Sequence, residues 1–147
     1  MVKFFKQGRV VIVLGGRMAG KKAVVCKTYD EGSKPRPFGH ALVVGLEKSP
    51  LKVNKKMGKK KVEKRMQCKP FIKYVNYNHL MPTRYVVGGD VLDTKTLVPD
   101  DFQNPEKKKE AKKEIKKTFH EKFMTPPLDK NGKVAKDLVF FRKKLRF

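Results

Sequence analysis

The chain has 147 residues, with 37 Lys or Arg against 14 Asp or Glu, a formal net charge of +23 and a pI near 10.2. The length suggests one domain with extensions, and so large a positive excess is atypical of an ordinary soluble enzyme; it indicates a polyanionic partner, with nucleic acid as the first candidate. A membrane surface is the second candidate, but no apolar run is long enough to span a bilayer and no helix with a broad apolar face is evident.

The N-terminal segment MVKFFKQGRV contains neither a long apolar stretch nor a small-residue cleavage site, so we expect no secretory signal. The chain has two cysteines, Cys26 and Cys68. Without a secretory signal, they are most simply interpreted as reduced cytosolic thiols.

Short apolar runs rich in β-branched residues predict strands through the first half of the chain. They are separated by Gly-rich and Pro-rich segments, a pattern that favours a small barrel or sandwich over βαβ units. The predicted strands cover residues 10–14, 23–29, 40–47, 71–77 and 84–88.

Residues 51–69 are a strongly basic insertion between the third and fourth predicted strands. They carry nine Lys or Arg and a single acidic residue, Glu63. The segment has too few apolar residues to fold alone, although a short helix is expected near residues 62–66. A charge run is usually a solvated face, but at this density binding to a polyanion is the favoured interpretation.

An acidic linker is expected at residues 89–104, followed by a helix at residues 105–125. Asn104 followed by Pro is typical of a helix start, and two further prolines follow the predicted end. Apolar residues recur every fourth position as a narrow stripe, so we expect the helix to dock along one line. The stripe is Ala111, Ile115, Phe119 and Phe123.

Residues 126–147 are predicted to be an extended basic tail with too little apolar mass to fold by itself. Phe140, Phe141 and Phe147 are expected to pack on a neighbouring protein or in an RNA groove, with neither alternative preferred.

The segment GGRMAGKK at residues 15–22 raises the question of a nucleotide-binding P-loop. Gly15, Gly20 and Lys21 match that motif, but Lys22 replaces the hydroxyl residue that would ligate Mg²⁺. A β-branched run follows the loop, where a P-loop needs a helix whose N-terminus faces the phosphates. A glycine-rich β-hairpin loop with basic side chains projecting from its tip is therefore the favoured interpretation.

The hairpin at residues 8–25 resembles the KOW motif of RNA-binding proteins, with Gly20 at the characteristic glycine. Further segments, RPFGHALVVGLEKSPLKV, YNHLMPTRYVV and the final FFRKKLRF, are similar to the eukaryotic large-ribosomal-subunit protein family number twenty-seven. The chain departs from that family's pattern at residues 88–104 and 125–138. The resemblance implies structural ribosomal RNA binding without catalysis or cofactor.

The predicted fold class is mainly β with α. The resemblance implies an SH3-like KOW barrel over residues 1–88, which contains the insertion 51–69. The linker 89–104, the helix 105–125 and the extended basic tail 126–147 complete the expected organisation.

Metal and catalytic chemistry have little support in the sequence. His40 could share a zinc site with Cys26, Cys68 or His79, but the close ligand pairs typical of zinc sites are absent. Neither serine lies beside an obvious base. We therefore expect no metal, no cofactor, no catalytic residue and no enzymatic activity.

The predicted RNA contacts are mostly cationic side chains, which would neutralise phosphates without reading sequence. His79 and Arg84 are favoured because they lie in a predicted loop stiffened by Pro82. Tyr74, Tyr77 and Tyr85 could stack on bases, although barrel packing is the stronger interpretation for each ring alone. The full set of candidate contacts is Arg9, Arg17, Lys21, Lys22, Arg36, Lys52, Lys55, Lys56, Lys59, Lys60, Lys61, Lys64, Arg65, Lys69, Lys73, His79, Arg84, Arg142, Lys143, Lys144 and Arg146.

The predicted function is that of a structural constituent of the large subunit of the cytosolic ribosome. Its expected partners are large-subunit ribosomal RNA and neighbouring ribosomal proteins, with no membrane and no small-molecule substrate. Basic clusters also suit nuclear and nucleolar transit during assembly. The alternatives are a free KOW-type RNA-binding transcription or assembly factor and a chromatin condenser, which the β-rich half disfavours.

Overall fold

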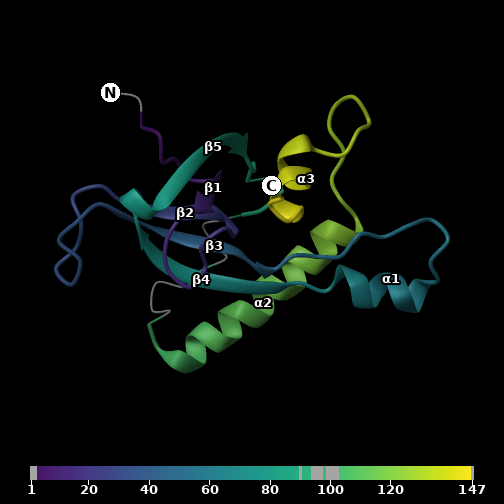
Figure 1. Ribbon diagram of the computed structural model, residues 1–147, viewed down its shortest axis with the longest axis horizontal. Helices are drawn as coiled ribbons and strands as arrows, with labels where there is room; N and C mark the ends of the chain where they lie inside the picture. Colours follow the sequence, from purple (N-terminus) through teal and green to yellow (C-terminus); the bar gives the residue numbers. More distant parts are fainter. Residues whose placement is uncertain (1–2, 90, 94–97, 99–102, 147) are drawn as a thin grey trace.

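The computed structural model describes residues 3–89, 91–93, 98 and 103–146. Within these residues it contains a five-stranded antiparallel sheet of order β4-β3-β2-β1-β5 and three α-helices (Figure 1). In chain order the elements are β1 (Arg9–Val13), β2 (Lys22–Tyr29), β3 (His40–Lys48), α1 (Lys59–Met66), β4 (Lys69–Asn76), the 3-10 helix η1 (Tyr77–His79), β5 (Leu80–Val86), α2 (Pro105–Met124) and α3 (Lys136–Arg142).

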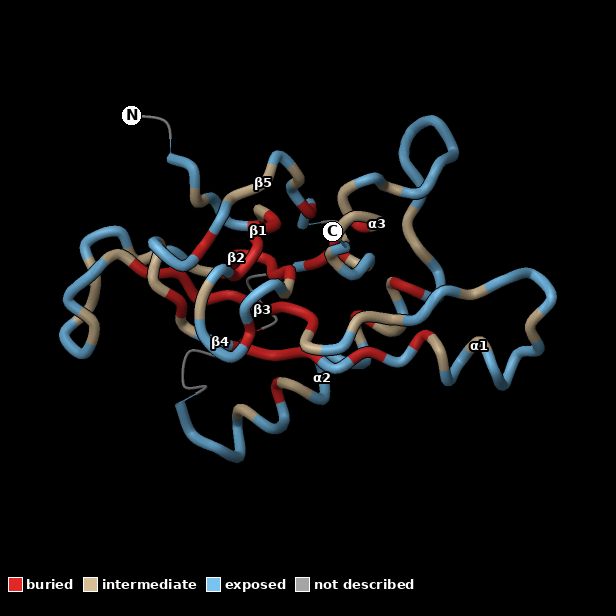
Figure 2. Tube along the Cα trace, viewed as in Figure 1, coloured by how far each residue is buried: buried red, intermediate tan, exposed pale blue. Residues whose placement is uncertain are grey.

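Both faces of the sheet are buried. Val11, Val25 and Val43 belong to one core cluster, whereas Val24 and Val44, which point to the opposite face, belong to a second cluster. The second cluster also contains the apolar residues of α2 and α3. Since successive residues face opposite sides of a strand, burial on both sides requires apolar residues at every position. This explains why the strands read as continuous apolar runs, and Figure 2 shows the central strands buried along much of their length.

Helix α2 covers one face of the sheet with its apolar stripe. Ala111, Ile115, Phe119 and Phe123 are all at most 3% exposed. Pro105 occupies the first turn of the helix, where its missing N–H removes no intrahelical hydrogen bond. The remaining faces of α2 carry mainly charged residues, so the helix contributes a narrow apolar line to the core and a basic surface to solvent.

The C-terminal segment differs from the extended tail that the sequence predicts. Residues Lys136–Arg142 form α3, and Leu138 and Phe141 are buried. The ring centroid of Phe141 lies 5.5 Å from that of Phe119 and 6.3 Å from that of Phe123. The apolar surface that orders α3 is thus supplied by α2, which is why the local composition of the tail does not reveal the helix.

Strand β5 begins earlier than predicted. It covers Leu80–Val86 and pairs with β1, with Pro82 opposite Val11. Arg84 was predicted both as the first residue of a strand at 84–88 and as part of the preceding loop, and it lies within the strand. Because β5 is an edge strand, the N–H that Pro82 lacks is tolerated there. The predicted loop stiffened by Pro82 is therefore part of a strand.

The mixed β and α fold class predicted from the sequence is confirmed, with an N-terminal β domain and a C-terminal helix. The β1–β2 hairpin expected from the KOW resemblance is present, and β1 pairs with both β2 and β5.

Of the helices in the described ranges, none combines the length and apolar character needed to cross a bilayer.

Candidate nucleic-acid interface

The loop between β1 and β2 is a compact glycine turn and not a P-loop. Gly16 and Gly20 have φ angles of 84° and 77°, the left-handed region that glycine adopts without steric cost. The N–H of Gly20 donates to the carbonyl of Val13 at 2.7 Å, which closes the loop. Strand β2 follows directly, where a P-loop has a helix whose N-terminus faces the phosphates, so the geometry does not suit a nucleotide phosphate.

Two cationic or titratable side chains from elsewhere in the chain lie beside this loop. A Cβ built on Gly15 would lie 3.4 Å from the ring of His79, and one built on Gly16 would lie 3.4 Å from Lys73 Nζ. The N–H of Leu14 donates to the carbonyl of His79 at 2.8 Å. The fold therefore brings β4, η1 and the hairpin loop together, and both Lys73 and His79 remain exposed.

Within the hairpin loop, Arg17 is exposed and Lys21 is half-buried. The structure corrects the placement of Lys22, which the sequence predicts at the loop tip. Its side chain is 6% exposed, and Nζ donates to the carbonyl of Phe140 at 2.8 Å while lying 3.8 Å from the centroid of the Phe140 ring. Burial, and secondarily the positive charge of Lys143, lower the pKa of Lys22. Lys22 therefore contacts α3 within the protein and does not project from the loop tip.

The basic insertion forms a loop and the short helix α1, which extends beyond the ends of β3 and β4 (Figures 1 and 2). Arg65 Nη1 donates to the carbonyl of Lys52 at 3.0 Å, and the N–H of Leu51 donates to the carbonyl of Arg65 at 2.8 Å. Lys69 forms an ion pair with Glu47 at 3.2 Å. The other lysines of the predicted set in this segment are all exposed, namely Lys52, Lys55, Lys56, Lys59, Lys60, Lys61 and Lys64.

Three predicted arginine contacts already have partners within the protein. The guanidinium of Arg36 lies 4.5 Å from the centroid of the Tyr74 ring, and that of Arg84 lies 5.1 Å from the Tyr85 ring. Arg9 is half-buried and donates to the carbonyl of Thr83 at 3.4 Å. Arg84 remains exposed, so its charge is still presented to solvent.

The tyrosines considered for base stacking are engaged inside the fold. The Tyr77 ring stacks on Phe5 with centroids 4.4 Å apart, and Tyr85 stacks on Phe140 at 4.1 Å. Tyr74 packs against the sheet cluster and lies edge-on to Tyr29. The barrel-packing interpretation therefore holds for these rings.

The aromatic residues of the tail were expected to pack on a neighbouring protein or in an RNA groove, and this was wrong for the two that the structure describes. Phe140 stacks on Tyr85, and Phe141 is fully buried against α2. Phe147 lies outside the described residues. Of the tail cations, Lys143, Lys144 and Arg146 are exposed and Arg142 is half-buried.

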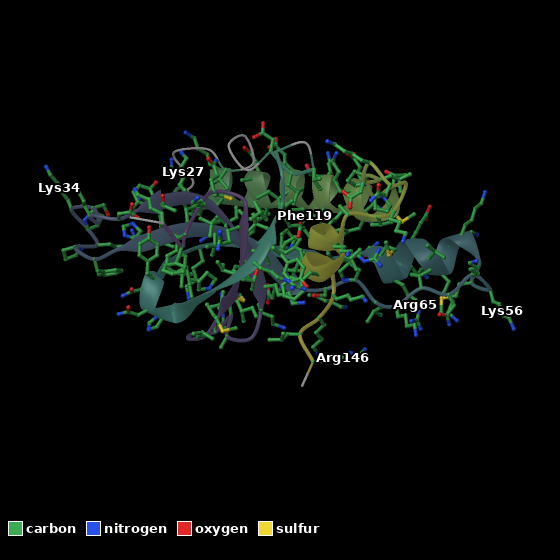
Figure 3. All side chains as sticks on the ribbon, turned by 90° about the horizontal axis from the view of Figure 1, so that it is seen from above. Lys27, Lys34, Lys56, Arg65, Phe119 and Arg146 are labelled. Carbon is green, nitrogen blue, oxygen red and sulfur yellow. The ribbon has the colours of Figure 1, made fainter. Side chains whose placement is uncertain are left out.

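Sequence reasoning left the basic surface of α2 out of the candidate set. Lys109, Lys113, Lys116 and Lys117 are exposed along this helix. The signal was present, since these lysines occupy the positions between the stripe residues and an amphipathic helix must present them to solvent. Lys34, Lys56 and Arg146 point outward on different sides of the molecule, so positive charge is dispersed and not gathered on one face (Figure 3).

The cysteines and histidines considered for zinc do not form a metal site in the described part of the chain, where no three His, Cys, Asp or Glu side chains are grouped to hold an ion. Cys26 and Cys68 are buried free thiols. Burial raises the pKa of the Cys26 thiol to about 12, and it also raises the pKa of the Cys68 thiol. His40 is buried and its ring stacks on Tyr29. Its Nδ1 atom lies 2.8 Å from the carbonyl oxygen of Phe38, so His40 has a packing role.

Comparison with known proteins gives a consistent result. The model of the ribosomal L27e protein family matches residues 10–147. Large ribosomal subunit protein eL27 of Tetrahymena thermophila is 52% identical over 147 residues, covering all of both chains. The protein eL27B of Saccharomyces cerevisiae is 56% identical over 123 residues, which is 83% of this chain and 89% of the yeast protein. Protein eL27 of Pisum sativum is 51% identical over 125 residues, 85% of this chain and 91% of its own.

Proposed function

The chain belongs to the ribosomal L27e protein family and is a structural constituent of the large ribosomal subunit, and from that premise we propose how it holds ribosomal RNA. The folded sheet positions separate groups of cations, and each group neutralises phosphates of a different RNA segment. The observation that carries this proposal is the dispersal of exposed Lys and Arg over the hairpin loop, the insertion, α2 and the C-terminal residues.

The RNA contacts are assigned to exposed cations at four places. The hairpin group is the exposed cations Arg17 and Lys73 with the half-buried Lys21, and the exposed imidazole of His79 lies beside them. The insertion group comprises the exposed lysines of residues 51–69 with Arg65, and the third group is the exposed face of α2. Lys143, Lys144 and Arg146 form the C-terminal group. We leave Lys22 out of the contacts because its ammonium group is hydrogen-bonded inside the protein.

Phosphate contacts of this kind fix position without reading bases, so specificity comes from RNA shape and from simultaneous reach to several segments. The rings of Tyr77 and Tyr85 stack on aromatic rings of the protein itself, which is a further reason to assign backbone recognition. Ordering the insertion loop on binding costs free energy, so the net affinity is lower than the phosphate contacts alone would give.

The protein has no catalytic role in this proposal, and its partners are large-subunit ribosomal RNA and adjacent ribosomal proteins. It acts in the cytosolic ribosome, and its basic segments support nuclear and nucleolar transit during assembly.

The test is sedimentation of the tagged full-length protein from a cell lysate, after a high-salt wash that separates the ribosomal subunits. We expect recovery at one copy per large subunit. Recovery at the top of the gradient would contradict the proposal and favour the alternative, a free KOW-type factor that binds RNA transiently.

A further inference from the structure

A solvent-accessible cavity of about 240 Å³ lies where the end of β3, the C-terminal end of α1, the start of β4 and the middle of α2 meet. We call it the basic cavity. Five of its lining residues are cationic: Lys48, Lys64, Arg65, Lys69 and Lys116. Four of them lie within residues 48–69 and the fifth lies on α2, so the fold brings two parts of the chain together.

The charge of the cavity is largely uncompensated. Of the five cations, Lys69 is paired with Glu47 at 3.2 Å. Within the described residues, no carboxylate lies within ion-pair distance of Lys48, Lys64 or Lys116, and Arg65 Nη1 donates to the backbone carbonyl of Lys52. The C-terminal end of α1 adds about half a negative charge. Four cations outweigh that partial charge, so the cavity attracts anions.

The fold fixes the backbone positions from which these cations project. The N–H of Leu51 donates to the carbonyl of Arg65 at 2.8 Å, which ties the loop after β3 to the end of α1. Lys116 follows the buried Ile115 on α2, and Cys68 at the cavity wall is 4% exposed and belongs to the core. The charge of Lys116 also acts to lower the pKa of the Cys68 thiol against the larger effect of burial, consistent with its position beside the cavity.

The size and lining of the cavity indicate which anion fits. Ligand pockets for drug-sized molecules measure about 300–1,000 Å³, so this cavity suits only a small group such as one or two phosphates. It has no aromatic lining on which a base could stack. Lys60 lies one turn before Lys64 on α1 and Lys113 lies one turn before Lys116 on α2, and both are exposed. Positive charge therefore continues from the cavity along both helices, as an anion that is part of a longer chain requires.

We propose that the basic cavity holds adjacent backbone phosphates at a bend of a ribosomal RNA strand, with Lys48, Lys64 and Lys116 as their main ligands. The inference rests on the proposed RNA-binding function and deepens it by assigning one specific subsite. A sharply bent backbone brings phosphates close together, and their mutual repulsion is offset where several cations converge.

The test compares two triple variants of the full-length protein. The cavity variant is Lys48→Gln, Lys64→Gln and Lys116→Gln; the control variant is Lys6→Gln, Lys34→Gln and Lys130→Gln, which removes the same charge from exposed lysines outside the cavity. Replacement of the three cavity lysines by Arg should retain binding. Circular dichroism and thermal unfolding of each protein verify that these surface changes leave the fold intact.

The first measurement is the affinity for large-subunit ribosomal RNA at several salt concentrations. A lost phosphate contact lowers the magnitude of the slope of log K against log salt by roughly one. We expect the slope of the cavity variant to fall by about two, with on the order of tenfold weaker binding near physiological salt, and that of the control variant to change by less than about one. Equal changes in both variants would overturn the assignment of the cavity as a phosphate site and leave the proposed RNA-binding function unaffected. Failure of the unmodified protein to bind the RNA would instead count against the proposed function.

The second measurement follows backbone amide signals during titration with inorganic pyrophosphate, a probe with two adjacent phosphates. We expect saturable shifts at Gln67 and Cys68 in the unmodified protein and the control variant, and none in the cavity variant. Shifts spread over all basic surfaces would refute a defined site. Saturable pyrophosphate binding combined with an unchanged RNA slope in the cavity variant would assign the cavity to a free anion and overturn its assignment to RNA.

Discussion

The ammonium group of Lys22 donates a hydrogen bond of 2.8 Å to the carbonyl oxygen of Phe140 and lies 3.8 Å from the centroid of the same residue's ring. This contact joins the first residue of β2 to α3, across most of the length of the chain. A lysine that the sequence assigns to RNA is thereby part of the protein's own tertiary structure.

Replacement of Lys22 by Met should loosen α3, because it removes a charge-assisted hydrogen bond and the cation–π contact. We expect the free energy of unfolding to fall by about 1–3 kcal/mol, with faster hydrogen exchange at α3 amides than at β3 amides. Denaturant titration and native-state exchange measure the two effects. Lys21→Met is the matched control, and equal exchange in both variants would contradict the role of Lys22.

Truncation of Phe141 should be the most damaging single change in the tail. Its side chain is fully buried against Phe119 and Phe123, so Phe141→Ala leaves a cavity and we expect a loss of about 3–5 kcal/mol in unfolding free energy. Leu128, which is 66% exposed, is the control, and Leu128→Ala should cost less than about 0.5 kcal/mol. If urea denaturation gives similar midpoints for both variants, α3 is not docked as described.

Gly45 is required by close packing between strands. A Cβ at this position would lie 2.6 Å from the carbonyl oxygen of Lys22 and 2.6 Å from ring atoms of Phe71. Neither the backbone nor the buried ring can yield easily, and we expect Gly45→Ala to cost about 1–3 kcal/mol, measured by thermal or urea unfolding. Gly88→Ala serves as the control because nothing lies within 4 Å of its added Cβ. Comparable stabilities of the two variants would show that the sheet relaxes around the new methyl group.

Stability should decrease at alkaline pH through Cys26. Burial raises the pKa of this thiol from 9.0 to about 12, so between these values the folded protein keeps a proton that the unfolded chain has lost. Unfolding is then favoured as pH rises, by about 1.4 kcal/mol at pH 10 from this group alone. The pKa of Cys68 is also raised by burial, which adds to the effect in the same direction.

Denaturant titrations between about pH 7 and pH 10 test this effect, with Cys26→Ala as the comparison. The variant should lose less stability over the range than the unmodified protein, whatever its absolute stability. Tyr77, whose pKa is raised to about 12 mainly by burial and then by its hydrogen bond to Asp30, is common to both proteins and cancels. Parallel pH profiles would exclude Cys26 as the cause.

The exposed lysines of the insertion should determine much of the salt dependence of RNA binding. Replacement of Lys52, Lys55, Lys56, Lys59, Lys60 and Lys61 by Gln removes phosphate-neutralising charges, so the slope of log K against log salt should flatten. Replacement of the same six lysines by Arg keeps the charge and should leave the slope nearly unchanged. An unchanged slope in the Gln variant would remove the insertion from the RNA interface.

Local patterns were reliable where the chain's own chemistry decides the outcome. The apolar stripe of α2 is buried at Ala111, Ile115, Phe119 and Phe123, and the run after the glycine loop is a strand and not a helix. Both follow from side-chain periodicity and β-branched composition, which act over a few residues. The family resemblance rests on the same local segments and is confirmed by the match to residues 10–147.

Patterns failed where a partner lies far along the chain. The tail appears too poor in apolar residues to fold, yet Phe141 is fully buried because α2 supplies the opposing surface. Pro82 was expected to stiffen a loop, yet it lies in β5, because an edge strand tolerates a missing N–H. In the same way, the charge of Lys22 predicted an exposed side chain, yet α3 covers it and accepts its hydrogen bond.

The sequence by itself determined that the chain is a basic protein of the L27e family with β and α elements, because composition, strand patterning and motif residues are properties of contiguous segments. Only the tertiary structure decided which cations remain available and which converge. Lys22 is buried, whereas Lys48, Lys64 and Lys116 line one cavity. The physical reason is that burial and electrostatic fields depend on distances in space, and those distances are set by the packing of α1, α2 and α3 around the sheet.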